Sequence, residues 1–243
     1  MRADHAELLR AFYHDTLAPP PRLSVSEWVE ENVVIPPGAE STSGAFSFHR
    51  VPYAREPLEC YADKSIRDLV LVFGTQCIKT TILRCGALYV ICNDPMPCVW
   101  ILPNEKPLAL SFSKNRWIPL VLECKAAQAY LPRTEKGKID RYRFGFLEQN
   151  FGRMTLNFVG SNSPANLSSR PAGFLQMDEV DKYGQETEFE PGALNNAEER
   201  AKNFPFSLIV KSSTPTVATH GIWPQFQLTD QRYYYVPCAR VPW

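Results

Sequence analysis

Short apolar runs alternate with longer stretches of helical spacing through most of the chain. A short continuous apolar run is typical of a strand that is buried on both faces of a sheet. We predict strands of this kind at residues 69–73, 98–102, 154–159, 174–177 and 206–210, and helices at 79–92 and 106–131. Strands that alternate with helices predict an α/β fold with a mostly parallel central sheet and helices on both of its faces.

The N-terminal part follows a different pattern. Apolar side chains at helical spacing predict a helix at residues 4–16, and Ser24 with Glu27 forms a capping-box pattern ahead of a second helix. Glycine, serine, threonine and proline predominate at residues 36–48, which predicts an exposed loop. We therefore expect a helical lead-in at residues 1–65, packed on a core domain at residues 66–243.

Composition narrows the possible classes of protein. Of the 243 residues, 44% are hydrophobic, which is enough to fill a core, and no apolar run is long enough to cross a membrane. The 26 basic and 26 acidic side chains cancel, so net charge gives no evidence for tight nucleic-acid binding, although a local patch would suffice for transient contact. Seven cysteines at irregular spacing argue against a disulfide framework.

Two adjacent carboxylates close the strand predicted at residues 174–177. They belong to Asp178 and Glu179. In a nucleoside triphosphate hydrolase, the first carboxylate of such a pair helps to hold Mg²⁺ and the second polarises the attacking water. Ligands of open α/β sheets bind at the carboxyl edge of the strands, where this pair would lie. The alternative interpretation is a buried strand that ends in an ordinary acidic turn.

The segment after the first predicted strand has features of a phosphate-binding loop. Lys79 followed by Thr80 fits the lysine and the hydroxyl of a P-loop, and both would open the next helix. Glycine normally precedes this lysine, because it reaches positive φ and lets the backbone approach the phosphates closely. Ile78 stands there instead, and Gly74 lies one residue too close to the lysine. The predicted loop comprises Gly74, Thr75, Gln76, Cys77 and Ile78.

A third strand also ends in polar residues. The strand predicted at residues 206–210 runs into Ser212-Ser213-Thr214-Pro215, whose hydroxyls would either sense a γ-phosphate or form an ordinary turn. The three motifs occur in the order that a RecA-like ATPase requires. Their combination is more specific than any one of them.

These motifs and the segments around them resemble the large terminase subunit of lambda-like phages. The resemblance extends over residues 23–238 and is carried by residues 23–28, 49–56, 160–171, 212–216 and 230–238. It implies a RecA-like (ASCE) P-loop ATPase that uses ATP and Mg²⁺ to move double-stranded DNA into a procapsid. It also implies a homo-oligomeric ring on the portal protein, a small terminase subunit as partner, and the host cell cytoplasm as location. A nuclease domain normally follows, and no nuclease activity is expected from a chain that stops at Trp243.

The resemblance assigns roles to the residues of the first two motifs. Lys79 would bind the β- and γ-phosphates, and Thr80 with Asp178 would hold Mg²⁺. Glu179 would activate the attacking water. The remaining loop residues would surround the phosphates.

Four further residues receive roles from the resemblance. Ser213 or Thr214 would couple hydrolysis to movement. Tyr53 resembles the adenine-contacting residue ahead of the P-loop, and its alternative role is packing at a helix start. Arg170 stands where related motors carry an arginine finger, which would act on a neighbouring subunit's nucleotide, and its alternative role is a structural salt bridge.

Departures from the family pattern leave other functions open. Ile78 in place of glycine would fit a non-hydrolysing relative that only docks on the portal or the small terminase. The cysteine pair that the resemblance implies as zinc ligands is broken, because Val241 stands where the partner of Cys238 should be. A helicase or repair translocase would need a second RecA-like lobe, and nothing in these residues supplies one.

A basic excursion at residues 132–153 is the candidate for DNA contact. Its basic side chains could follow phosphates without reading bases. The alternative is a solvated loop, which three acidic neighbours favour (Glu135, Asp140 and Glu148). The basic residues are Arg133, Lys136, Lys138, Arg141 and Arg143.

Overall fold

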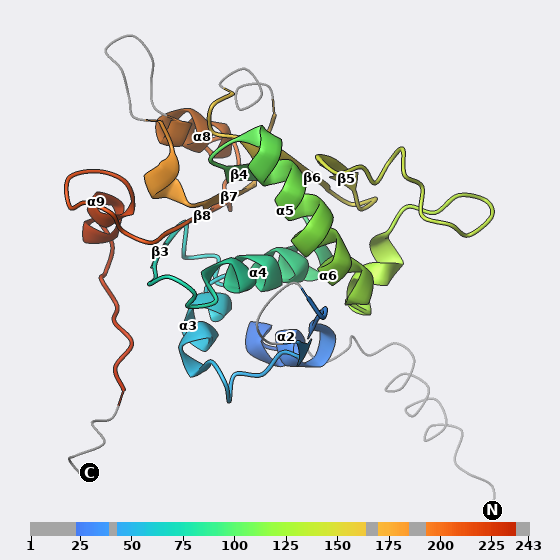
Figure 1. Cartoon of the computed structure of the whole chain (residues 1–243), viewed down its shortest axis with the longest axis horizontal. Coiled ribbons are helices and arrows are strands. Elements are labelled where there is room, and N and C mark those ends of the chain that lie inside the picture. The colour runs from blue at the N-terminus through green and yellow to red at the C-terminus, as the bar shows by residue number, and fades with distance from the viewer. Residues whose placement is uncertain (1–22, 39–42, 164–169, 185–192, 237–243) are drawn as a thin grey trace, which may run out of the picture.

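The structure is a computed structural model that describes residues 23–38, 43–163, 170–184 and 193–236 (Figure 1). The helix predicted at residues 4–16 and the position of Cys238 lie outside these residues.

A six-stranded sheet forms the centre of the described structure. Its strands lie in the spatial order β3-β8-β7-β4-β6-β5, and every neighbouring pair is parallel except β5 with β6. The mostly parallel sheet predicted from the sequence is therefore confirmed. The strands are β3 (Asp68–Val72), β4 (Cys98–Leu102), β5 (Glu148–Asn150), β6 (Thr155–Gly160), β7 (Phe174–Asp178) and β8 (Leu208–Ser213).

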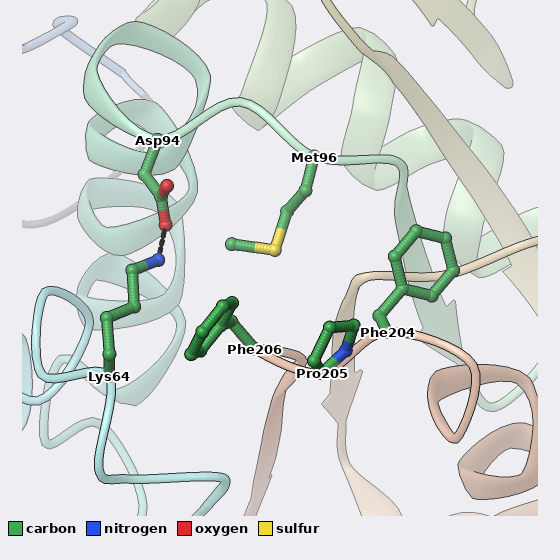
Figure 2. A pocket seen from close by; sticks show the side chains of 6 residues that line it. All are labelled: Lys64, Asp94, Met96, Phe204, Pro205 and Phe206. Carbon is green, nitrogen blue, oxygen red and sulfur yellow. Dashed lines mark hydrogen bonds and ion pairs between the residues drawn. The ribbon is translucent and has the colours of Figure 1, made fainter.

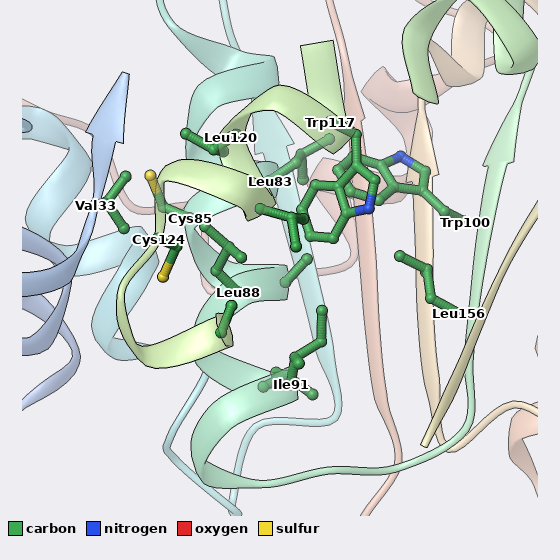
Figure 3. Close-up of a cluster of buried hydrophobic side chains, with 14 of the residues drawn as sticks. Val33, Leu83, Cys85, Leu88, Ile91, Trp100, Trp117, Leu120, Cys124 and Leu156 are labelled. Atoms are coloured by element: carbon green, nitrogen blue, oxygen red, sulfur yellow. The ribbon is translucent and has the colours of Figure 1, made fainter. Parts of the chain in front are cut away.

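Side chains of the central strands alternate between two apolar clusters on opposite faces of the sheet. In β4, Trp100 belongs to the larger cluster, whereas Val99 and Ile101 belong to the smaller one. Figure 3 shows the larger cluster around Trp100 and Trp117. Because both faces are buried, the central strands consist of nearly continuous apolar residues.

Helices contribute to both clusters, as predicted. Figure 1 shows α2, α3 and α4 on one side of the strands and α8 on the other. The helices that pack in the larger cluster are α2 (Val25–Asn32), α3 (Arg55–Glu59), α4 (Lys79–Asn93), α5 (Leu110–Phe112) and α6 (Ile118–Glu123). Those in the smaller cluster are α8 (Ala193–Ala201) and α9 (Ile222–Gln227).

The stretch predicted as helical at residues 106–131 is helical with short irregularities. Two π-helical turns, η3 (Glu105–Ala109) and η4 (Ser113–Trp117), flank α5, and the 3₁₀ turn η5 (Ala126–Tyr130) follows α6. Two further 3₁₀ turns are η2 (Pro52–Ala54) and η6 (Val180–Lys182).

The helical segments before β3 pack on α4. Ser24 and Glu27 form the predicted capping box, in which each side chain accepts a hydrogen bond from the other's backbone N–H. The apolar side of α2 lies in the larger cluster together with α4. Gly86 of α4 allows Tyr61 to pack closely, because a Cβ there would lie 2.1 Å from the Tyr61 ring.

Three expectations about the elements are wrong. Only Leu71 of β3 is buried, because β3 is an edge strand of the described sheet and has one neighbour. The segment at residues 36–48 is not simply an exposed loop, since it includes part of the pair β1 (Val34–Ile35) and β2 (Gly44–Ala45), and Phe46 and Phe48 are buried. The antiparallel strand β5 has no counterpart among the predicted strands, because three polar residues carry no apolar run.

Candidate active site

Three sequence motifs meet at the carboxyl edge of the sheet. β7 ends at Asp178, and the neighbouring β8 carries Ser212 in register with it. On the other side of β8 lies β3, whose following loop leads into α4. This topology brings the N-terminus of α4 next to the Asp-Glu end of β7, although about a hundred residues separate them in sequence.

Direct contacts join the four residues predicted to carry the chemistry. The Lys79 Nζ lies 2.5 Å from Glu179 Oε1 and 3.5 Å from Asp178 Oδ1. The Thr80 hydroxyl donates to Asp178 Oδ2 at 3.2 Å, and the Ser212 hydroxyl donates to Asp178 Oδ1 at 2.8 Å. Lys79 and Asp178 are only 7% and 3% exposed. Because water hardly reaches them, each charge is stabilised by the opposite charge of the other in place of solvent.

Glu179 sits on a bend that turns its carboxylate toward two lysines. Its backbone is left-handed, with φ of 62°, and Lys182 Nζ lies 2.8 Å from its second oxygen. Burial raises the pKa of the Glu179 carboxyl, but hydrogen bonds and charge from Lys182 and Lys79 outweigh burial and leave this pKa below its ordinary value. The carboxylate is therefore ionised at neutral pH, as a group that accepts a proton from water must be.

The loop before α4 takes the shape that glycine usually supplies. Ile78 is left-handed, with φ of 49°, and Gln76 is left-handed with φ of 58°. For an L-residue this conformation costs roughly 1–2 kcal/mol, and more for a β-branched one. Gly74, Thr75 and Gln76 are exposed, whereas Cys77 and Ile78 are half-buried. The loop ends at the N-terminus of the 15-residue helix α4, where backbone N–H groups favour an anion.

The side chains around Asp178 fit a magnesium ion. The Thr80 hydroxyl and the Asp178 carboxylate are oxygen ligands, which Mg²⁺ prefers, and Mg²⁺ commonly takes one or two carboxylates and completes its shell with phosphate oxygens and water. Within the described ranges, no group of three or more histidine, cysteine, aspartate or glutamate residues gathers as a metal site. Thr80 and Asp178 are therefore the residues that would hold Mg²⁺.

Tyr53 lies near the phosphate loop. Its ring centroid is 6.2 Å from that of Phe73, which directly precedes Gly74, and 5.9 Å from that of Tyr234. These contacts keep both predicted roles open, because a ring beside the loop can pack against protein or contact a base.

Arg170 does not join the cluster within the chain. Its guanidinium lies 3.2 Å from the Glu148 carboxylate and hydrogen-bonds Asn157, so it sits over β5 and β6. These strands lie at the opposite edge of the sheet from β3. Arg170 therefore forms the salt bridge that was its alternative role, on strands that β4 and β7 separate from β8 and β3.

The two hydroxyls at the end of β8 contact different acidic residues, one through its carboxylate and the other through its backbone N–H. Ser212, which belongs to the predicted polar motif but has no part in the predicted coupling role, contacts Asp178, whereas the Ser213 hydroxyl accepts a hydrogen bond from the Asp181 backbone N–H at 3.2 Å. Thr214 contributes its carbonyl, which accepts from Ser213. The register of β8 with β7 places Ser212 opposite Asp178, and the alternation of side chains along the strand turns Ser213 to the other face.

The basic excursion protrudes from the body between α6 and β5, where Figure 1 shows it in yellow-green. All five of its predicted basic residues are exposed, and none has a carboxylate partner among the described residues. Of the acidic neighbours, Asp140 accepts the Tyr142 backbone N–H and Glu148 pairs with Arg170.

An apolar hollow of about 330 Å³ lies away from the cluster (Figure 2). Its lining comes from residues that precede β4 and β8, which places it at the amino edge of the parallel strands. Phe204, Phe206 and Met96 form its apolar walls, and an ion pair between Lys64 and Asp94 closes one side. Separately, no helix in the described parts of the chain has the length and apolarity that a membrane crossing needs.

The fold and the cluster together define the class of this protein. In the sheet, β8 lies between β3, which leads into the loop before α4, and β7, which ends in Asp178. One strand inserted between these two is the topology of the RecA-like (ASCE) P-loop nucleoside triphosphatase fold. The family model described as phage terminase large subunit gpA, ATPase domain, matches residues 40–241, and the chain belongs to this family.

Comparison with solved structures gave matches to another phage terminase. The large terminase ATPase domain of Thermus phage P74-26 is 15% identical with a TM-score of 0.41, and the alignment covers 66% of this chain and 65% of that one. An arginine-to-alanine mutant of the same domain is 13% identical with a TM-score of 0.37, and 62% and 61% of the two chains are covered. The search of curated proteins gave no match.

Proposed function

We propose that this terminase domain hydrolyses ATP and uses the energy to move double-stranded DNA into a procapsid. The observation that carries the proposal is the contact of Lys79 and Thr80 with Asp178 and Glu179 at the carboxyl edge of the sheet. Membership in the terminase large subunit family supports the same function.

The proposed reaction follows from the charges in the cluster. Lys79, which two carboxylates now neutralise, exchanges them for the β- and γ-phosphate oxygens of ATP. Glu179 is then free to orient a water molecule and to accept its proton as the water oxygen attacks the γ-phosphorus. The bond between the γ-phosphorus and the bridging oxygen breaks, and ADP leaves. Mg²⁺, held by Thr80 and Asp178, would neutralise phosphate charge.

The proposal extends to the residues beside the cluster. Tyr53 contacts adenine. Its ring lies beside Phe73, which directly precedes the predicted phosphate-binding loop, and this position supports the contact. Arg170 acts on the nucleotide of a neighbouring subunit in a ring, after release from Glu148. Ser213 and Thr214 couple hydrolysis to movement.

The partners of this activity are also part of the proposal. We infer a ring of identical subunits that meets the portal protein, the small terminase subunit and duplex DNA in the host cell cytoplasm. The exposed basic residues of the excursion at 132–153 support a contact with DNA phosphates.

One observation favours a second function. Ile78 holds a left-handed conformation that is costly for a β-branched residue, so a loop relaxed from this conformation would not receive phosphates. The domain would then act as a docking module on the portal or the small terminase without hydrolysis.

Calorimetry of Mg²⁺-dependent ATP binding, together with turnover measurements, distinguishes the two functions. We expect the unaltered chain to bind and hydrolyse ATP, Lys79→Ala to lose binding, and Glu179→Gln to bind while its turnover falls on the order of 100-fold or more. Glu199→Gln, an exposed glutamate paired with Lys202, is the matched control and should behave as the unaltered chain does.

The opposite results would decide against hydrolysis. Unaltered turnover in Lys79→Ala and Glu179→Gln would show that the cluster is not the active site. Binding that appears only after Ile78→Gly would favour the docking module.

A further inference from the structure

Asp181 connects the turn that carries Glu179 with the segment that follows β8. Its carboxylate Oδ2 accepts hydrogen bonds from the Thr216 backbone N–H at 2.7 Å and from the Thr216 hydroxyl at 2.9 Å. Its Oδ1 accepts from the Ile222 backbone N–H at 2.8 Å. The Asp181 backbone N–H donates to the Ser213 hydroxyl. One residue thus holds both ends of the segment at residues 214–222.

The segment is shaped around this carboxylate. Gly221 has φ of +74°, and a Cβ at that position would lie 2.6 Å from the Asp181 carboxylate. Only glycine fits there while the carboxylate occupies the bend. α9 begins directly afterwards, lies against β3 and β8, and is joined to β8 by a hydrogen bond between Lys211 and Gln225 at 3.0 Å. The position of α9 therefore depends on where Asp181 lies.

The same short turn contains the proposed general base. Glu179 is the first residue of the turn, with a left-handed backbone, and its carboxylate contacts Lys79 and Lys182. When Lys79 exchanges Glu179 for phosphate oxygens, the turn loses the ion pair that joins it to the N-terminus of α4. Asp181 lies two residues away in the 3₁₀ turn η6, so a rotation of the turn changes its three hydrogen bonds to residues 216 and 222.

We propose that Asp181 is a positioning residue that transmits the state of the Glu179 turn to residues 214–222 and to α9. This inference rests on the proposed hydrolytic function, and it adds the route by which nucleotide binding reaches α9. Asp181 has no contact with Lys79, Thr80 or Asp178 among the described interactions, so its role is distinct from holding phosphate or metal.

Hydrogen exchange provides the test. The exchange rates of peptides that cover residues 214–228 are measured with and without Mg²⁺ and a slowly hydrolysed ATP analogue, in the unaltered chain and in Asp181→Asn. The asparagine amide keeps the shape of the aspartate side chain. Its NH₂ group, however, faces either the donors of Thr216 or the backbone N–H of Ile222, and it cannot accept a hydrogen bond from them. Asp230→Asn is the control, because that carboxylate pairs with Arg232 outside the turn.

We expect the analogue to bind the unaltered chain, Asp181→Asn and Asp230→Asn with equal affinity. The analogue should change exchange in residues 214–228 of the unaltered chain and the control only. In Asp181→Asn we expect that change in exchange to be absent. We also expect kcat to fall on the order of tenfold with KM unchanged, because a fall of this size corresponds to the loss of one hydrogen bond to a charged group.

Three results would overturn the inference. An unchanged exchange response in Asp181→Asn, or a parallel loss of binding affinity, would contradict a positioning role. No binding to the unaltered chain would instead remove the proposed function and this inference with it, and calorimetry identifies that case. If Asp181→Asn does not fold, Thr216→Val carries the same test, because it removes only the hydroxyl hydrogen bond of an exposed residue.

Discussion

Ile78 is the residue at which local preference and required geometry conflict most strongly. Its left-handed backbone costs roughly 1–2 kcal/mol, yet its half-buried side chain packs against the larger apolar cluster. Partial burial of an isoleucine recovers free energy of a comparable size. The two contributions offset each other, which explains how a β-branched residue can occupy the position of a glycine.

This balance leads to a prediction for Ile78→Gly. Relief of the backbone and loss of side-chain packing should leave the free energy of unfolding nearly unchanged, measured by urea denaturation. Nucleotide affinity should rise about tenfold, which corresponds to ~1.4 kcal/mol, because glycine lets the loop approach the phosphates.

Gln76→Gly is the control for this prediction. Gln76 is also left-handed, but it is exposed and does not precede the lysine. It should gain stability without the same gain in affinity. A fall in affinity for Ile78→Gly would contradict the argument and give the isoleucine side chain a direct part in binding.

At the scale of single elements, β8 shows how a strand distributes its polar residues. Ser212 reaches Asp178 and Ser213 reaches Asp181, because successive side chains of a strand point to opposite faces. The end of one strand thereby contacts both the carboxylate of Asp178 and the backbone N–H of Asp181.

The basic excursion is the element for which charge makes a measurable prediction. Replacing Lys136 and Lys138 together with alanine should weaken binding to a duplex of arbitrary sequence. The plot of log affinity against log salt should become shallower by about 1 for each phosphate that the double variant no longer neutralises. Fluorescence anisotropy at several salt concentrations measures both quantities.

The matched control removes two lysines elsewhere. Lys64 and Lys202 are exposed but paired with Asp94 and Glu199, so their replacement by alanine should leave the salt dependence unchanged. Equal slopes for the two double variants would show that residues 132–153 are a solvated loop, the alternative that the sequence leaves open.

At the scale of the whole molecule, two clusters hold the sheet between layers of helices. Trp100 is fully buried at the centre of the larger cluster, where its ring lies within 6 Å of the rings of Phe112, Trp117 and Phe158. Aromatic groups arranged in this way stabilise a core beyond the area that they bury.

Truncation of this side chain should destabilise the whole domain. Trp100→Ala is expected to lower the free energy of unfolding by about 3–5 kcal/mol, measured by urea denaturation with the slope m monitored. Trp223→Ala, a half-buried tryptophan of α9, should cost clearly less. An equal cost at the two positions would argue against a single central cluster.

The sequence by itself determined which segments are helices and which are strands, and it determined the four residues that meet at the candidate active site. Apolar runs and helical spacing are local patterns, so β4, β7 and α4 could be predicted closely. Lys79, Thr80, Asp178 and Glu179 could be predicted because each stands at the end of an apolar strand or at the start of a helix, where its chemistry is recognisable without knowledge of neighbours.

The tertiary structure alone decided which elements are neighbours. The place of β3 at an edge, the pairing of the polar strand β5, and the contact of Arg170 with Glu148 depend on lateral strand order. The choice of Ser212 for Asp178, and the hold of Asp181 on residues 216 and 222, depend on register and on loop geometry. These properties arise from packing between segments that are distant in the sequence. A local pattern of residues cannot predict them, because it contains no information on the free energy of contacts between distant segments.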